Sequence, residues 1–211
     1  MDFRVIRGYC LSLPIYGAGY STWSKTLSGL SSMNYLPILV SIVAAAIPTL
    51  LYVLTIYWAD RYEREPLRLL LIAFFWGAIP AVIVSVAGEL LLEEPLLDIP
   101  AINQMAFSNV LIAPIIEETA KWLALLGIYF FRRKEFDGPL DGLVYGALIG
   151  FGFAMTENIF FFVGAYNQGG YEALTSVFVL RGIIFGMSHA FYTALAGIAL
   201  GIARNTDGAF T

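Results

Sequence analysis

Long apolar segments constrain the fold of this 211-residue chain more than any other feature. A helix needs about 20 apolar residues to cross the hydrocarbon core of a bilayer, and five segments reach that length. They run over approximately 36–59, 67–92, 105–131, 140–165 and 177–203. There are no ten-residue segments of alternating polarity, which a β-barrel would require. The sequence therefore predicts an all-α integral membrane protein, a multi-pass bundle of about five transmembrane helices.

The composition agrees with this class and excludes others. Hydrophobic residues make up 59% of the chain and charged residues 13%, whereas soluble domains carry about 25% charged residues. The net charge is −4 and the isoelectric point is near 5.0, so there is no basic surface for nucleic acid and no nucleic-acid partner is expected. Residues 1–35 are rich in Gly, Ser and Tyr and are expected to form an interfacial or partly disordered segment before a membrane-embedded core over 36–211.

The connections between the apolar segments predict an orientation in the membrane. Two of them are basic and the one between them, over 93–103, is acidic. The basic residues are Arg61, Arg64 and Arg68 in the first connection and Arg132, Arg133 and Lys134 in the third. The acidic residues are Glu93, Glu94 and Asp98. Because cytoplasmic loops carry an excess of Lys and Arg, we expect the two basic connections to lie in the cytoplasm.

Four charged residues lie in the middle of predicted spans: Glu117, Glu118, Lys121 and Glu157. One charge at the bilayer centre costs about 2.5–3.5 kcal/mol on insertion scales, so four together would cost on the order of 10 kcal/mol. Pairing or neutralisation must reduce this cost. We expect these residues to line a functional polar pocket, and the alternative is a buried ion pair that sets the register of the helices.

The third segment brings three of these charges within one helical turn. Lys121 follows Glu117 by four residues and Glu118 by three, so its ammonium group can reach either carboxylate. Two adjacent glutamates in a low-dielectric environment do not both ionise easily. A glutamate that holds its proton near neutral pH can act as a general acid or base.

The fourth segment carries a ridge of small residues spaced by four, which ends in an acid and an amide. The ridge consists of Gly142, Gly146, Gly150 and Ala154 and leads to Glu157 and Asn158. Small residues let helix backbones approach closely in membranes, and packing alone is the commoner meaning of such a ridge. Here close packing would also deliver Glu157 and Asn158 into the helix interface, where the amide could hydrogen-bond a developing oxyanion.

The spacing of small residues in the fifth segment predicts a similar ridge, made of Gly182, Gly186, Ala190 and Ala194. His189, the only histidine of the chain, lies next to it, four residues before Thr193. A histidine in a glycine-rich spanning helix indicates function more often than a lone histidine in a soluble protein does. Arg181, at the outer end of this segment, is interpreted as an interfacial anchor or an ion-pair partner.

Four motifs in these segments resemble the PrsW family of intramembrane proteases, relatives of the glutamate-type CAAX-processing membrane endopeptidases. The run Glu117-Glu118-Thr-Ala-Lys121 resembles the family's EExxK motif. The other three are Asp60 to Pro66 (DRYEREP), Asp141 to Asn158 (DGLVYGALIGFGFAMTEN) and Ser188-His189-Ala190. The resemblance covers approximately Leu50 to Gly201, and the combination of motifs is more specific than any one of them.

The resemblance implies proteolysis inside or at the edge of the bilayer of a prokaryotic plasma membrane. Glu117 and Glu118 match the catalytic pair, and Glu157 and His189 complete the pocket. The expected supporting residues are Lys121, Asn158, Asp141 and Arg181. The implied substrates are single-span membrane proteins such as anti-sigma factors. Family members typically continue through further spans with a second histidine in an H-G-x-x-D-like motif, and this sequence has no second histidine.

The mechanism favoured by these residues is hydrolysis by a water molecule held between the glutamate pair and Glu157 or His189. One glutamate would remove the proton of the water, and Asn158 or His189 would stabilise the oxyanion. In a metal-dependent variant, Glu118, Glu157 and His189 would bind zinc. Familiar zinc proteases use two histidines and a glutamate, so the single histidine here ranks this variant, and zinc as a cofactor, second.

Two other classes of protein share some of these features. Ion- or proton-coupled transporters also combine intramembrane carboxylates, kinked helices and glycine ridges, but the five segments show no inverted repeat. A non-catalytic membrane scaffold could bind single-span partners in the same polar cleft, and it predicts that Glu118→Gln leaves function unchanged or alters only stability.

Overall fold

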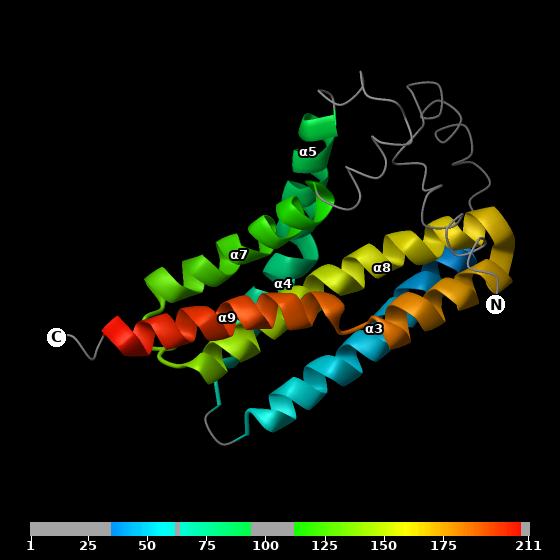
Figure 1. Cartoon of the computed structure of the whole chain (residues 1–211). Helices are drawn as coiled ribbons and strands as arrows, with labels where there is room; N and C mark the ends of the chain where they lie inside the picture. Colours follow the sequence, from blue (N-terminus) through cyan, green and yellow to red (C-terminus); the bar gives the residue numbers. More distant parts are fainter. Residues whose placement is uncertain (1–34, 62–63, 94–111, 208–211) are drawn as a thin grey trace.

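The computed structural model describes residues 35–61, 64–93 and 112–207, and every regular element within them is a helix. Figure 1 shows their arrangement. In chain order they are α3 (Tyr35–Ala59), α4 (Leu67–Trp76), the π-helix η3 (Gly77–Ala81), α5 (Val82–Glu93), α7 (Ala113–Phe131), α8 (Pro139–Val177), the π-helix η6 (Phe178–Ile184) and α9 (Ser188–Asp207). The all-α prediction is confirmed for this part of the chain. The expected N-terminal segment lies almost entirely outside it.

Within the described residues, three helical stretches are long and apolar enough to cross a membrane. They are Tyr35–Ala59, Leu67–Glu89 and Pro139–Asn205. The third is 67 residues long and contains both the fourth and the fifth predicted segments. The third predicted segment corresponds to the charged helix α7, and residues 105–111 of it lie outside the described residues. The count of about five spans stays a prediction.

The long stretch reverses its direction at a pair of glycines. Gly169 and Gly170 interrupt the helical backbone of α8, and Gly170 has a φ of +64°. Side chains make this left-handed region unfavourable, whereas glycine adopts it readily. The chain turns back at this end of α8 and returns through η6 and α9 (Figure 1), so the fourth and fifth predicted segments are antiparallel neighbours.

The predicted small-residue ridge of α8 forms the contact with α9. A Cβ atom added to Gly142 would lie 2.0 Å from the carbonyl oxygen of Gly197, and one added to Gly150 would lie 2.5 Å from the Cα of Ala190. Only hydrogen fits in these spaces, so the two backbones are in direct contact. The ridge of α9 differs from the prediction. It runs from Ala190 to Gly197 and Gly201 and does not include the predicted Gly182 and Gly186.

That correction has a structural reason, because the helix is interrupted between η6 and α9 at residues 185–187. The interruption changes the rotational phase of the helix. Gly182 consequently faces the rings of Phe178 and Phe162, and Gly186 approaches the ring of Tyr52. The first half of the predicted ridge therefore packs away from α8's glycine face.

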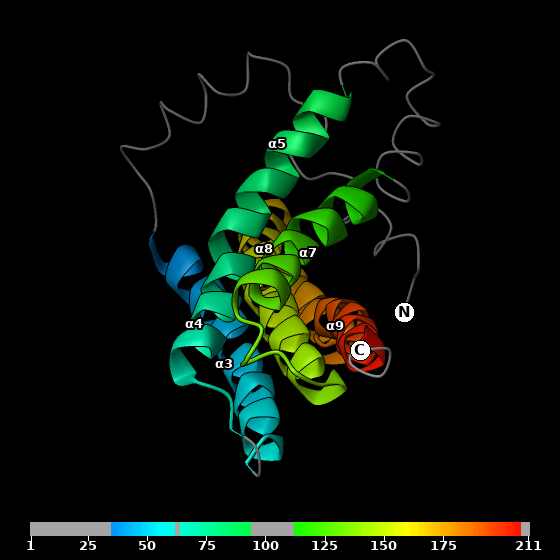
Figure 2. The same ribbon diagram turned by 90° about the vertical axis from the view of Figure 1, so that its left-hand side faces the viewer.

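Other faces of α8 contact α4, η3 and α3, so α8 lies at the centre of the bundle (Figure 2). A Cβ added to Gly77 would lie 1.9 Å from the carbonyl oxygen of Ile149, which shows another direct backbone contact. The ring of Tyr52 stacks on Phe151 with a centroid distance of 5.7 Å. Many large apolar side chains point outward from this bundle, which suits a surface surrounded by lipid.

The two basic connections meet at the same end of the bundle. Glu65, in the first connection, contacts Tyr145 near the start of α8. Arg204 of α9 donates hydrogen bonds to the backbone carbonyls of Tyr129 and Arg133. This agrees with the prediction that both connections lie on one side of the membrane. The acidic connection over 93–103 falls outside the described residues, apart from the backbone of Glu93.

The α8–α9 contact predicts opposite effects of two glycine-to-alanine substitutions. Gly142→Ala should destabilise the protein by about 1–3 kcal/mol, because the methyl group overpacks the interface. Gly127→Ala in α7 is the matched control, since its added Cβ meets no atom within 4 Å, and helix propensity favours alanine there by up to about 1 kcal/mol. Thermal unfolding in detergent micelles measures both. Equal melting temperatures for the two variants would contradict the tight contact.

Candidate active site

Polar side chains from α7, α8, η6 and α9 converge inside the bundle. The cluster contains all four predicted catalytic residues and three of the four predicted supporting residues. Its members are Glu117, Glu118, Lys121, Glu157, Asn158, Arg181, His189 and Thr193. Glu117, Glu157 and His189 are each about one-fifth exposed, at 16%, 20% and 21%. The cluster is therefore accessible from outside the bundle.

Lys121 lies at the buried centre of the cluster. Its side chain has no exposed surface, and its Nζ atom lies 2.6 Å from Oε1 of Glu118 and 2.9 Å from Nδ1 of His189. The ammonium also lies 4.0 Å from the centre of the Phe153 ring. A buried ammonium is stable only when it is paired and hydrogen-bonded, and a carboxylate, an imidazole and an aromatic ring provide those contacts here.

The contact with Lys121 assigns the hydrogen on the imidazole ring of His189. An ammonium group only donates hydrogen bonds, so Nδ1 accepts one from Lys121. In the neutral ring the hydrogen is then on Nε2, which lies 2.9 Å from Oε2 of Glu157 and donates to it. His189 thus connects Lys121 of α7 with Glu157 of α8 in a single orientation.

Arg181 binds the other side of Glu157. Its Nη2 atom lies 2.6 Å from Oε2 of Glu157, and its Nε atom donates to Oδ1 of Asn158 over 3.0 Å. Its guanidinium lies 3.7 Å from the centre of the Phe161 ring. Of the two interpretations from the sequence, the structure supports the ion-pair partner. Asn158 is almost fully buried and its carbonyl oxygen holds Arg181.

The two adjacent glutamates have different surroundings. Both oxygens of Glu118 are held, Oε1 by Lys121 at 2.6 Å and Oε2 by the hydroxyl of Thr193 at 3.2 Å. The contacts of Glu117 to Lys121 and His189 are longer, at 3.8 and 3.9 Å, and these exceed hydrogen-bonding distance. Among the described contacts, Glu117 is therefore the least restrained carboxylate of the cluster.

Sequence reasoning did not assign a role to Thr193 or Phe153. Thr193 is fully buried, and its single hydroxyl hydrogen is shared between Glu118 and the carbonyl oxygen of His189. Phe153 lies under Lys121 and packs against the ring of His189. Helical spacing could have indicated both residues, because Thr193 follows His189 by one turn and Phe153 precedes Glu157 by one turn, on the same helix face.

The donor groups of this cluster do not fit a metal ion. The oxygens of Glu118 are engaged by Lys121 and Thr193, and Glu157 is paired with Arg181. A divalent ion would lie beside two positively charged side chains, which repel it. Within the residues that the structure describes, no group of three His, Cys, Asp or Glu side chains is arranged to hold a metal. We therefore derive no step through one.

Asp141 is the one predicted supporting residue that lies away from the cluster. It is in the first turn of α8, 16 residues before Glu157, which is about 24 Å along a helix. Its Oδ2 atom accepts hydrogen bonds from the backbone N–H groups of Asp137 and Gly138, at 2.8 and 2.7 Å. Its local role is to begin α8, because these backbone donors have no partner within the helix.

Asp141 also belongs to a second group of polar residues, with Glu65 and Tyr145. The pKa of the Glu65 carboxyl is raised from 4.5 to about 8, mainly by burial; the hydrogen bond from Tyr145 opposes this shift and the hydrogen bond to Asp141 contributes to it. At neutral pH Glu65 is therefore mostly protonated. It accepts a hydrogen bond from Tyr145 and, as a neutral acid, donates one to Asp141.

Comparison with known proteins identifies the family. The family model described as "PrsW family intramembrane metalloprotease" matches residues 65–210. The chain belongs to the PrsW family. Protease PrsW of Geobacillus kaustophilus is 32% identical over 70% of this chain and 60% of its own length. Protease PrsW of Bacillus subtilis is 30% identical over 70% of this chain and 62% of its own length. Protease PrsW of Shouchella clausii is 30% identical over 79% of this chain and 71% of its own length.

The PrsW match includes both polar groups, from Glu65 to His189 and beyond, and confirms the family indicated by the motifs. The chain spans about 60% of the length of the first two curated relatives. No solved structure matches the chain.

The second polar group predicts a pH dependence of stability. The pKa of Glu65 is higher in the folded protein, at about 8, than its ordinary 4.5. Its stabilising contribution is then complete below pH 4.5 and is lost as the pH rises through about 8. Glu65→Gln keeps an acceptor and a donor but no titration, so its melting temperature should fall less than that of the wild type between pH 5 and 9. Glu172→Gln, at an exposed position of α8, is the control. Parallel curves for wild type and Glu65→Gln would contradict the assignment.

Proposed function

We propose that this protein is an intramembrane protease that hydrolyses peptide bonds of single-span membrane proteins with a glutamate-activated water molecule. The observation that carries the proposal is the continuous series of contacts from Glu118 through Lys121, His189 and Glu157 to Arg181. These contacts join α7, α9, α8 and η6 in a bundle whose surroundings are apolar. The printed name of the relatives, Protease PrsW, agrees with this activity.

Glu117 is the proposed general base. Its carboxylate is less exposed than that of Glu118, at 16% against 28%, but its contacts are the longest of the three, so it is available to a water molecule. Glu118 is fully engaged and instead positions Lys121. In the proposed step, Glu117 takes a proton from the water as the water oxygen bonds to the carbonyl carbon of the substrate.

The remaining groups act on the tetrahedral intermediate. Its oxyanion receives a hydrogen bond from the partly exposed His189, whose Nε2 hydrogen is then shared between Glu157 and the oxyanion while Nδ1 keeps its contact with Lys121. The positive charge of Arg181, held beside Glu157 by Asn158, adds electrostatic stabilisation. Glu117 then transfers its proton to the leaving nitrogen as the C–N bond breaks, which yields a carboxylic acid and an amine and restores the carboxylate.

The charge balance of the cluster suits this exchange of protons. The cluster contains three carboxylates, Glu117, Glu118 and Glu157. They face two cations, Lys121 and Arg181, so the ionised cluster with neutral His189 carries one net negative charge. In surroundings of low dielectric constant, uptake of one proton by the cluster is therefore favourable. The proton removed from water neutralises the cluster, and the same negative charge passes to the oxyanion of the intermediate.

The proposed substrates are membrane-anchored regulators of the anti-sigma-factor type, and the proposed location is the plasma membrane of a prokaryotic cell, in a bundle of about five spans. The apolar outer surface of the helices supports residence in a bilayer. The partly exposed cluster supports access of an extended peptide segment. A metal-dependent form of the same hydrolysis is the second candidate, because the matching family description contains the word metalloprotease.

Two glutamate substitutions test the assignment of the base. Glu117→Gln should lower the turnover of a single-span peptide in proteoliposomes by about 10²–10⁴-fold, the usual contribution of a general base. Its melting temperature should stay close to that of the wild type. Glu118→Gln should lower both turnover and melting temperature, because it weakens the contact with buried Lys121.

Glu172→Gln serves as the matched control, since Glu172 is an exposed glutamate outside the cluster. Full activity in both cluster variants would refute the role of the pair. If wild type and variants bind single-span peptides equally but none cleaves them, the non-catalytic scaffold explains the protein better.

Chelation tests the metal-dependent candidate. Because the described donor set does not fit a metal ion, purified protein should keep its activity after exhaustive treatment with EDTA and phenanthroline. The measurement is the cleavage rate before and after treatment, with bound zinc determined by elemental analysis. Loss of activity that returns on addition of zinc would establish the metal-dependent form instead.

A further inference from the structure

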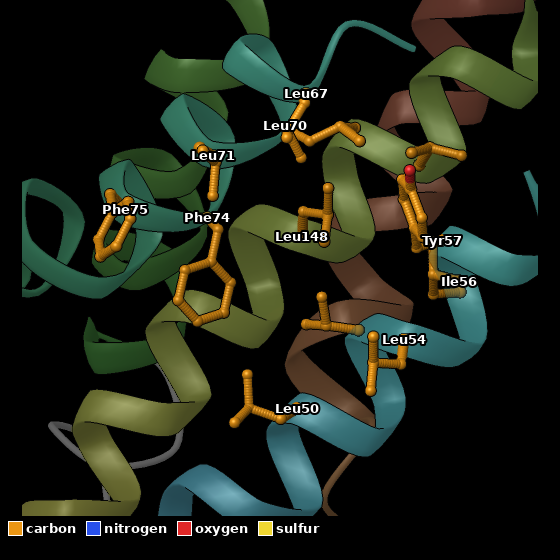
Figure 3. A pocket seen from close by; sticks show the side chains of 12 residues that line it. Leu50, Leu54, Ile56, Tyr57, Leu67, Leu70, Leu71, Phe74, Phe75 and Leu148 are labelled. Carbon is orange, nitrogen blue, oxygen red and sulfur yellow. The ribbon is translucent and has the colours of Figure 1, made fainter. Parts of the chain in front are cut away.

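A cavity of about 450 Å³ lies between α3, α4 and α8, at a distance along α8 from the polar cluster. Figure 3 shows the side chains that line it, with those of α3 facing those of α4. Leu50, Val53, Leu54, Ile56 and Tyr57 come from α3, Leu67, Leu70, Leu71, Phe74 and Phe75 from α4, and Val144 and Leu148 from α8. Its size falls within the range of about 300–1,000 Å³ for ligand pockets.

The lining selects the chemistry of the occupant. The Tyr57 hydroxyl is the only polar side-chain group among these residues, so nothing in the walls could recognise a polar solute. Leu54 and Leu67 are 58% and 61% exposed, which shows that the groove opens to the outside of the bundle. In a protein of this family the outside is lipid, and an acyl chain is the flexible apolar group present there.

One end of the groove lies at the first basic connection. Tyr57 is near the end of α3 and Leu67 is the first residue of α4, so this end of the groove lies where these two helices are joined in the chain. The guanidinium of Arg64 lies 5.4 Å from the centre of the Tyr57 ring. Arg68 follows Leu67 directly, and both arginines are exposed. Positive charge therefore stands at the mouth of an apolar groove.

The connection over 60–68 keeps an excess of positive charge, because it carries Arg61, Arg64 and Arg68 against Asp60, Glu63 and a mostly neutral Glu65. The carboxylate of Asp60 accepts a hydrogen bond from the backbone N–H of Glu65 over 3.3 Å. The carboxyl group of Glu65 points inward to Tyr145 and, with a pKa of about 8 caused by burial, is mostly neutral. The exposed arginines thus provide the charge that a ligand at this end meets.

We propose that the groove binds one acyl chain of an anionic phospholipid and that Arg64 and Arg68 bind the phosphate of its headgroup. Charge complementarity commits the site to an anionic lipid, because juxtamembrane arginines attract anionic headgroups by about 1 kcal/mol each. The groove does not share a residue with the polar cluster. This proposal rests on the membrane location of the family and is independent of the proposed protease activity.

Native mass spectrometry of the detergent-solubilised protein tests the headgroup contact. Titration with phosphatidylglycerol and with phosphatidylcholine of the same chains should show tighter binding of phosphatidylglycerol. The double variant Arg64→Gln/Arg68→Gln should bind phosphatidylglycerol about 30-fold more weakly. The matched control is Arg133→Gln/Lys134→Gln, which removes the same charge from the other basic connection and should change binding little. Equal losses in the two double variants, or equal binding of both lipids, would overturn the proposal.

A second pair of variants tests the groove itself. Leu54 lines the groove and Leu51 does not, although the two are almost equally exposed on α3, at 58% and 60%. Leu54→Trp should fill the groove and weaken phosphatidylglycerol binding about tenfold, the loss expected when roughly two methylene groups are displaced. Leu51→Trp should leave binding unchanged. Unaltered lipid binding in Leu54→Trp, or a protein dimer that this variant alone disrupts, would show that a lipid does not occupy the groove.

Discussion

The direct backbone contact between α8 and α9 determines where the candidate catalytic residues meet. Gly150 lies against Ala190 with space for no side chain, so α9 cannot slide along α8 without a collision. His189 is thereby held within hydrogen-bonding distance of Glu157, two turns further along α8. In a bilayer, where apolar surfaces gain little by leaving lipid, such close van der Waals packing is a main source of helix association.

Pairing of the buried charges is the second condition for this arrangement. Lys121 is held by Glu118 and His189, and Glu157 by Arg181 and His189. Each of these groups alone would be costly within a membrane, and together they form one network. Preorganised charge of this kind favours reactions in which charge develops, because little rearrangement is needed when the intermediate forms.

The central helix α8 borders both the polar cluster and the apolar groove. Its glycine ridge and Glu157 face α9 and the polar cluster, whereas Val144 and Leu148 face the apolar groove beside α3 and α4. A ligand in the groove would contact the same rigid helix that carries Glu157. The separation of polar and apolar functions on one helix follows from its rotational periodicity, because residues on different sides of a turn face different neighbours.

Much of this organisation is readable in the sequence. Runs of about 20 apolar residues require helices, and the charges within them mark a polar site, because the bilayer leaves few alternatives. The four motifs also indicated the family. Glu117, Glu118, Glu157 and His189 were recognised by their unfavourable placement. The i, i+3 and i, i+4 spacings to Lys121 are properties of one helix and need no tertiary information.

Contacts between helices were decided only by the tertiary structure. The sequence left open which glutamate pairs with Lys121, and the packing of α9 resolves it by placing Thr193 against Glu118. It assigned Asp141 to the site, whereas the length of α8 separates them. It extended the ridge of α9 to Gly182, whereas a helix interruption changes the phase. Local periodicity predicts which residues share a helix face, but the neighbour that meets this face depends on how separate helices turn and pack.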